Sequence, residues 1–326
     1  MVSGILTLQM KESYIMKISL IVPCYNEQDN VEEFHKVATA TFSNTSYDYE
    51  MTFINDGSKD NTLNILKKIY EKDTKHVNVV SFSRNFGKES AIYAGLKNVS
   101  GDFVTIIDAD LQQRPELVLD MLKILEENKD YDCVAAYQKE RHEGTILKFF
   151  KSLFYKLINK VSEVEFRAGA SDFRTMRKSM ADALVSLPEY HRFSKGLFSW
   201  VGFNTYFMPY VAEERFSGSS KWSFISLFKY AINGIVAFTV SPLKVATYIG
   251  ATFSFISLLY MVVVIIQKLF FSIDIPGYPT LISVILLLGG LQLLILGIIG
   301  EYLARMYIET KNRPIYIEKV NLKAHD

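Results

Sequence analysis

Two long apolar runs near the C-terminus constrain the fold of this chain more strongly than any other feature. The first covers residues 246–271 and is interrupted only by Gln267 and Lys268, and the second, residues 280–299, carries no charge. Crossing the ~30 Å hydrocarbon layer of a bilayer takes roughly 20 helical residues, and each run reaches that length. We therefore predict a two-helix transmembrane hairpin over residues 244–307, with a buried helical pair of a soluble protein as the alternative.

The basic residues around the hairpin predict its orientation. The connector at 271–278 contains neither Lys nor Arg, whereas Lys244, Arg305, Lys311 and Arg313 flank the outer ends of the two runs. Basic residues concentrate on the cytoplasmic side of membrane proteins. We expect a multi-pass protein of the cell (inner or plasma) membrane, with both termini and the residues before the hairpin in the cytoplasm.

The first two thirds of the chain alternate short apolar runs with amphipathic helical patterns. The strand-like runs are residues 17–22, 49–55, 77–83, 102–108 and 132–137. Helical patterns lie between them, near residues 29–42, 60–72, 87–98 and 115–128. This alternation is typical of βαβ units, so residues 17–222 are predicted to form a Rossmann-like α/β domain with a mostly parallel sheet. Such sheets bind ligands at the carboxyl ends of their strands.

Three further segments complete the predicted organisation. Residues 1–16 are an N-terminal extension without the pattern of a secretory signal, and Met16, just before the first strand, is a possible true start. Residues 223–243 are rich in aromatics and are interpreted as an amphipathic helix in the membrane interface, with a buried core helix as the alternative. Residues 308–326 are expected to be a cytosolic tail.

Composition excludes several classes of protein. The formal net charge of +1 argues against a general nucleic-acid binder, which usually carries a strong basic excess. The two cysteines, Cys24 and Cys133, have no metal-ligand spacing around them, and so few cysteines argue against a disulfide framework. A reducing compartment is consistent with this cysteine usage.

The strongest chemical signal is the pair Asp108 and Asp110 at the end of an apolar strand. Two carboxylates one residue apart can hold a hard divalent cation such as Mg²⁺ or Mn²⁺, which in turn can bridge the phosphates of a nucleotide donor. An aspartate pair alone is weak evidence, because such pairs are common on surfaces. Its position between a buried strand and a helix favours the metal interpretation.

Two other motifs follow predicted strands. In NDGSKDNT (55–62), Gly57 allows a tight turn and Ser58 or Asp60 can cap the next helix, which leaves Asp56 for a ligand such as a nucleoside. In PCYNE (23–27), an aromatic ring could face a base. All of these motifs lie at the predicted carboxyl edge of the sheet.

In this order and spacing, PCYNE, NDGSKDNT, RNFGKE (84–89) and DADLQ (108–112) resemble family 2 glycosyltransferases with the GT-A fold. More closely, the chain is similar to the polyprenyl-phosphate glycosyltransferases, which include dolichol-phosphate mannose synthase and the bactoprenol glucosyltransferases. The likeness spans residues 17–320 and extends to three later segments, at 171–178, 191–203 and 215–222, and to the paired hairpin.

The resemblance implies inverting transfer of a sugar from a nucleotide-sugar, preferably UDP-linked, to a polyprenyl (undecaprenyl) phosphate. The product would serve cell-envelope glycan modification, and a homo-oligomer, tetrameric as in related proteins, is expected. A phosphate monoester has its second pKa near about 6, so the acceptor is already largely ionised at neutral pH. No obligatory general base is therefore predicted.

The resemblance also implies the site residues. Nucleotide-sugar binding is expected from Pro23, Tyr25, Glu27, Asp56, Arg84, Lys88, Asp108 and Gln112. The metal ligands would be Asp108, Asp110 and Gln112, and the acceptor phosphate would meet Ser171 and Arg174. The catalytic set is Asp110, Arg174, Arg215 and Lys221, the last two on a loop that grips phosphate. A solvated basic loop is the alternative for Arg215 and Lys221. Asn55 departs from the aspartate common in the family, which leaves the role of this position in doubt.

Two other functions are weighed against this one. A processive polysaccharide synthase of the same fold usually carries a Q-x-x-R-W motif and more membrane helices, but residues 191–222 contain no Gln and two spans cannot enclose a polymer. A non-catalytic nucleotide-sugar sensor would not need the intact set of Asp108, Asp110 and Gln112.

Overall fold

The computed structural model describes residues 15–138, 170–211, 239–271 and 277–325, with the single positions 159, 213 and 236. Its centre is an eight-stranded sheet in the order β7-β5-β6-β4-β1-β2-β3-β8. The strands are β1 (Lys17–Cys24), β2 (Asp48–Asn55), β3 (Val77–Phe82), β4 (Phe103–Ile106), β5 (Cys133–Gln138), β6 (Ala170–Arg177), β7 (Thr205–Tyr210) and β8 (Glu318–Leu322).

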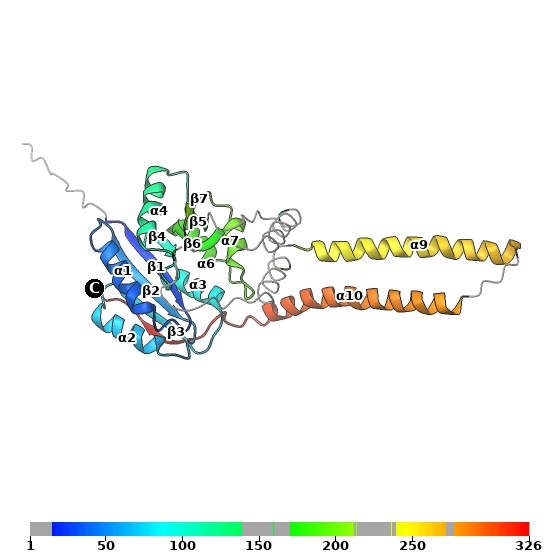
Figure 1. Cartoon of the computed structure of the whole chain (residues 1–326), viewed down its shortest axis with the longest axis horizontal. Helices are drawn as coiled ribbons and strands as arrows, with labels where there is room; N and C mark the ends of the chain where they lie inside the picture. The colour runs from blue at the N-terminus through cyan, green and yellow to red at the C-terminus, as the bar shows by residue number, and fades with distance from the viewer. Residues whose placement is uncertain are drawn as a thin grey trace, which may run out of the picture.

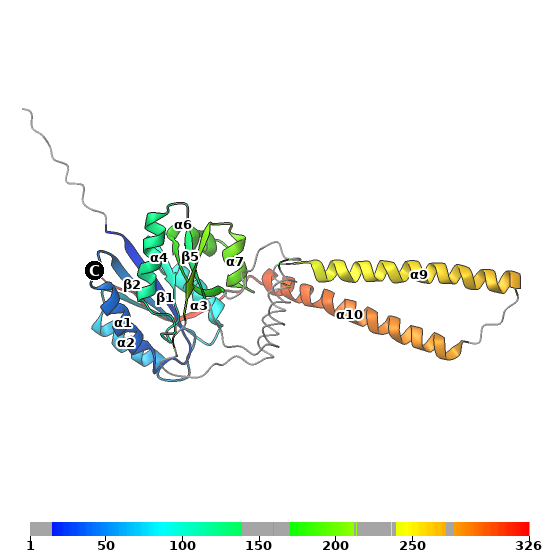
Figure 2. The ribbon, with the colours of Figure 1, turned by 45° about the horizontal axis from the view of Figure 1, so that its top comes forward.

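Helices cover both faces of this sheet (Figures 1 and 2). One face packs against α1 (Val31–Phe42), α2 (Thr62–Lys72) and α4 (Glu116–Glu127). The other packs against α3 (Lys88–Lys97), α6 (Lys178–Val185) and α7 (Ser194–Trp200). The prediction of a mostly parallel, Rossmann-like sheet is confirmed, and the predicted helices between the first five strands all form.

The central strands are apolar because both of their faces are buried. In β1, Leu20 and Val22 belong to the core under α1, α2 and α4, whereas Ile21 points to the opposite core under α3. Successive side chains of a strand alternate between faces, so a strand covered on both sides must be apolar throughout. The lack of a side chain at Gly95 lets α3 approach β1 closely, since a Cβ there would lie 2.2 Å from Cγ2 of Ile21.

Two strands depart from the parallel pattern. β6 lies antiparallel between β4 and β5, and β8 lies antiparallel on the outer side of β3. Residues 308–326, expected to be a tail, thus contribute an edge strand to the domain. The periodicity of a five-residue edge strand is too short to stand out from the sequence, and only its pairing with β3 reveals it.

The two apolar runs form the long helices α9 (Ser241–Phe271) and α10 (Tyr278–Thr310), which extend side by side away from the domain (Figures 1 and 2). Both helices are long and apolar enough to cross a membrane, and their apolar stretches are not buried against protein. A helix that exposes apolar side chains all round needs a lipid environment. Most of the predicted interfacial helix at 223–243 and both Arg215 and Lys221 lie outside the described residues.

Candidate active site

The predicted motifs gather at the carboxyl edge of the sheet because their strands are neighbours. β4, β1 and β2 lie side by side, and β3 follows β2. The loops after these four parallel strands therefore emerge at the same edge, where open α/β sheets bind ligands.

The loops after β1 and β2 are joined by side-chain hydrogen bonds. The backbone N–H of Asn26 donates to Oγ of Ser58 at 2.9 Å, and Oδ1 of Asn26 accepts from the N–H of Lys59 at 2.9 Å. Ser58 is therefore occupied by the neighbouring loop, whereas Asp60 accepts from the N–H of Thr62 at the start of α2 at 3.0 Å. Of the two capping candidates, Asp60 bonds the helix end. These contacts place PCYNE directly beside NDGSKDNT.

Asp56 organises the segment before α3. This carboxylate is only 3% exposed, and its two oxygens accept the N–H groups of Phe86 at 2.6 Å and Gly87 at 2.9 Å. Burial raises the pKa of Asp56, although the two N–H donors and Arg84 act in the opposite direction. Asp56 thus shapes the loop that carries Arg84 and leads to Lys88 at the start of α3. Its contact with a nucleoside stays a prediction.

The structure gives Asn55 a role that the sequence left in doubt. Its side chain is 1% exposed, its Nδ2 donates to Oγ of Ser81 at 2.9 Å, and its Oδ1 accepts the N–H of Ser58 at 3.3 Å. An aspartate would lose the Nδ2 donor and bury a charge. The amide therefore fastens the end of β2 to β3.

Lys88 links Asp108 to a carboxylate that the sequence analysis missed. Its Nζ lies 2.7 Å from Oδ1 of Asp108 and 3.3 Å from Oδ2 of Asp172. Burial would lower the pKa of Lys88, but the two carboxylates outweigh it and hold that pKa well above its usual range. Asp172 belongs to β6, so its place beside Asp108 follows from the antiparallel pairing of β6 with β4. Residues 170–177 show no alternation of apolar and polar residues, so no sequence signal pointed to this placement.

Asp110 and Gln112 lie in a tight turn after β4. Oδ1 of Asp110 accepts the N–H of Gln112 at 3.2 Å, and Leu111 between them adopts a positive φ of 56°. A branched residue in this conformation is strained, and such strain clusters at functional sites. Gln112 also pairs with the backbone of Glu213 through two hydrogen bonds of 3.2 and 3.3 Å, and Arg114 contacts the carboxylate of Glu213 at 2.6 Å. Glu213 is thereby anchored at this turn.

The donor set of this turn fits a hard divalent cation. The side chain of Asp108 is 33% exposed, and its carboxylate already forms an ion pair with the ammonium of Lys88. Asp110 and Gln112 are partly exposed and supply further oxygen atoms, the ligand type that Mg²⁺ prefers. Among the described residues, no group of three or more His, Cys, Asp or Glu side chains is arranged as a metal centre. Two carboxylates and one amide would leave room around an octahedral ion for oxygen atoms of a bound nucleotide.

Ser171 and Arg174 do not form an exposed pair. Oγ of Ser171 donates to the carbonyl of Ala136 at 3.1 Å within the sheet. Arg174 is 4% exposed, its guanidinium lies 3.4 Å from the ring centroid of Phe198, and Nη2 donates to the carbonyl of Ser171 at 3.1 Å. Burial lowers the pKa of Arg174, whereas its interactions with Cys133 and Asp172 act to raise that pKa. Contact of either side chain with an acceptor phosphate stays a prediction.

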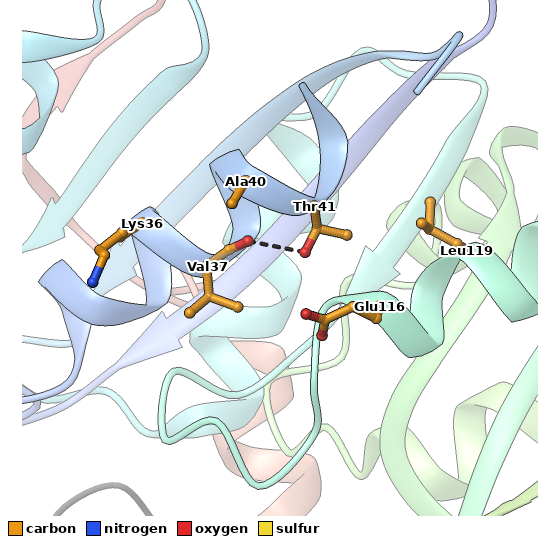
Figure 3. Close-up of a pocket in the computed structure, with 6 residues that line it drawn as sticks. All are labelled: Lys36, Val37, Ala40, Thr41, Glu116 and Leu119. Carbon is orange, nitrogen blue, oxygen red and sulfur yellow. Dashed lines mark hydrogen bonds between the residues drawn. The ribbon is translucent and has the colours of Figure 1, made fainter. Parts of the chain in front are cut away.

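A shallow groove of about 450 Å³ between α1 and α4 contains none of the predicted site residues. Its lining comes from these two helices alone: Lys36, Val37, Ala40, Thr41, Glu116 and Leu119 (Figure 3).

Glu89 gives the site a pH-dependent neighbour. Burial and the charge of Asp172 raise its pKa to about 7, although the N–H and Oγ of Ser194 and the charge of Arg192 act in the opposite direction. Because the pKa in the folded state exceeds the ordinary 4.5, the folded protein holds an extra proton between these two values. Stability should therefore fall as pH rises from about 4.5 to 7 and level off above that.

The test is the variant Glu89→Gln, which keeps a hydrogen-bond acceptor for Ser194 without the charge. The thermal unfolding midpoint of the purified protein should decline between pH 5 and 7.5 more steeply in the wild type than in the variant. Equal slopes would show that Glu89 does not titrate in this range.

Comparison with known proteins assigns this fold and site to an enzyme class. The profile of Glycosyl transferase family 2 matches residues 19–185, and that of the GtrB C-terminal hairpin matches residues 241–306. The chain therefore belongs to glycosyl transferase family 2. It is a glycosyltransferase with a GT-A domain and a two-helix hairpin, which confirms the resemblance drawn from its motifs, and the hairpin indicates membrane association.

Two relatives match nearly the full length of the chain. The glycosyltransferase CsbB of Bacillus subtilis is 45% identical over 302 residues, covering 93% of this chain and 91% of the relative. The bactoprenol glucosyl transferase of Shigella phage SfII is 42% identical over 305 residues, covering 93% and 98%. Mannosyl-3-phosphoglycerate synthase from Rubrobacter xylanophilus is a structural neighbour with a TM-score of 0.48 and 19% identity, covering 68% of this chain and 73% of that one.

Proposed function

We propose that this protein transfers a sugar from a UDP-linked donor to a polyprenyl phosphate such as undecaprenyl phosphate, giving a lipid-linked sugar for cell-envelope glycans. The observation that carries the proposal is the union, in one chain, of a family 2 domain with the GtrB hairpin. The chain also aligns with 98% of a protein named as a bactoprenol glucosyl transferase. A hairpin beside the catalytic domain suits an acceptor that never leaves the membrane.

The donor would bind at the carboxyl edge of the sheet. Pro23, Tyr25, Glu27 and Asp56 are proposed for the nucleoside, and Arg84, Lys88, Asp108 and Gln112 for the sugar and its diphosphate. Asp108, Asp110 and Gln112 are proposed to hold Mg²⁺ or Mn²⁺. A bound divalent ion would neutralise charge on the departing nucleoside diphosphate.

The chain's own residues would bring two anions together. The ammonium of Lys88 forms ion pairs with Asp108 and Asp172. From this position, the Lys88 side chain can rotate to contact the diphosphate of a donor. Arg215 and Lys221 are proposed to grip phosphate, and Ser171 and Arg174 to serve the acceptor end. An ionised acceptor oxygen would displace the nucleotide in a single inverting step, so alignment and charge stabilisation matter more than proton removal.

The basic residues that flank the hairpin support a particular membrane orientation. We propose that the catalytic domain and both termini lie in the cytoplasm, where nucleotide-sugars are made, and that the protein forms a homo-oligomer. This orientation puts the donor site and the phosphate headgroup on the same side of the bilayer.

The test uses membranes that contain the wild-type chain and labelled UDP-sugars. We expect label in an organic extract, and we expect it to disappear when undecaprenyl phosphate is withheld from a purified, lipid-depleted preparation. Label in a water-soluble or insoluble polymer would instead support the polysaccharide synthase. Nucleotide-sugar binding without any transfer would support the sensor.

A further inference from the structure

The chain returns to the catalytic domain after the membrane hairpin. Beyond α10, the backbone turns at Asn312, which has a positive φ of 47°, and then runs along the outer edge of β3 as β8. Figure 1 shows this final segment in red, passing from α10 along the sheet to a C-terminus beside α1 and α2. The N–H of Ser83 donates to the carbonyl of Ile317 at 2.9 Å, just before β8 begins.

Tyr316 is the side chain that ties this segment to the interior. Its ring stacks on Phe82 with the centroids 4.8 Å apart and the planes 22° from parallel, and it meets the edge of Tyr93 at 6.4 Å. Phe82 is 2% exposed and Tyr93 is 7% exposed. Burial, followed by the charge of Glu318, raises the pKa of Tyr316 to about 12, as expected for a ring held in the protein.

The same aromatic contacts continue into the RNFGKE segment. Phe82 meets Phe86 edge-on, with the centroids 5.8 Å apart. The guanidinium of Arg84 lies 3.9 Å from the ring centroid of Phe86, whose N–H is bound by Asp56. A continuous row, Tyr316–Phe82–Phe86, therefore connects the chain after the hairpin with the loop before α3. We call it the aromatic row.

The register of β8 adds a reason for such a contact. The pairing of β3 with β8 shifts between Ser81 and Phe82, so the ladder is irregular where β3 leads into the RNFGKE segment. Backbone pairing alone therefore defines this end of β3 less well than its middle. The ring of Tyr316, stacked on Phe82, helps to fix the position of this end of β3. In other proteins an aromatic pair contributes about 0.5–1.5 kcal/mol beyond its buried area.

We propose that Tyr316 is a positioning residue for the donor site: through the aromatic row, the strand that follows the membrane hairpin holds the segment at 84–88 in the geometry that presents Arg84 and Lys88 to the nucleotide-sugar. The inference rests on the proposed function for the roles of Arg84 and Lys88. It means that the donor end of the domain is completed only after both membrane helices have been made.

The experiment compares Tyr316→Ala with Tyr316→Phe and Ile317→Ala in the full-length, detergent-purified protein. Tyr316→Phe keeps the stacked ring, and Ile317→Ala removes an exposed side chain (54%) from the adjacent position. Losing one aromatic contact should raise the donor KM and the Kd for UDP with Mn²⁺ roughly three- to tenfold in Tyr316→Ala. The lipid-phosphate KM should stay unchanged, and the two control variants should match the wild type.

Several outcomes would overturn the proposal. An unchanged donor KM and UDP Kd in folded Tyr316→Ala would do so, and so would equal losses for donor and lipid, which indicate general damage. If Tyr316→Ala does not fold, Tyr316→Leu retains apolar bulk without the ring, and faster hydrogen exchange in residues 84–88 than in Ile317→Ala is then required. Calorimetric titration with UDP distinguishes this proposal from the proposed function. If the wild type failed to label a lipid, the proposed function would be refuted. A weaker binding of UDP by Tyr316→Ala than by the control variants would still support the role of Tyr316.

Discussion

Replacing Asp110 with Asn should reduce sugar transfer about 100- to 1,000-fold, the usual cost of removing one preorganised charge-stabilising group from an active site. The change removes a carboxylate from the turn after β4, where Asp108 and Gln112 supply the other proposed metal ligands. An Asn side chain can still accept the N–H of Gln112 that Oδ1 of Asp110 accepts at 3.2 Å. The turn should therefore keep its shape, and the loss should come from charge.

The measurement is the initial rate of labelled-sugar transfer to polyprenyl phosphate at saturating Mg²⁺ or Mn²⁺, with Mn²⁺ affinity followed by electron paramagnetic resonance. Asp130→Asn is the matched control, because Asp130 is exposed in the loop before β5, at the opposite edge of the sheet. A wild-type rate in Asp110→Asn with metal present would refute the metal assignment.

Gly57→Ala should unfold or distort the donor edge of the domain. Gly57 has a φ of +61°, and a Cβ at this position would lie 2.3 Å from the carbonyl carbon of Arg84 and 2.6 Å from its oxygen. The left-handed conformation costs a non-glycine residue about 1–2 kcal/mol, and the backbone of Arg84 must also shift to relieve the clash. That shift would pull on the segment held by Asp56, so UDP binding should weaken together with stability.

Gly202→Ala separates the two causes. Gly202 also has a positive φ, of +73°, but nothing lies within 4 Å of a Cβ placed there. Its substitution should lower the unfolding midpoint by only the conformational cost, a few degrees for a domain of this size. The drop in Gly57→Ala should be at least twice as large, as measured by thermal unfolding in detergent. Equal drops would mean that the contact with Arg84 has no energetic importance.

The sequence predicted the parts of this protein that depend on local patterns. An apolar run longer than about 20 residues has few stable alternatives to a membrane helix, so the hairpin could be recognised without any tertiary information. The alternation from residue 17 to residue 138 predicted the parallel part of the sheet, and strand adjacency then placed Asp56 and Asp108 at one edge. The order of the motifs was sufficient to recognise the family.

The tertiary structure decided what depends on pairing between distant segments. β6 and β8 run antiparallel, and neither their direction nor their neighbours can be inferred from periodicity, because a strand's pattern records only which faces are buried. Asp172 could be placed beside Lys88, and Tyr316 beside Phe82, only once those pairings were known. Local sequence therefore determined the elements, whereas long-range packing determined which side chains meet at the site.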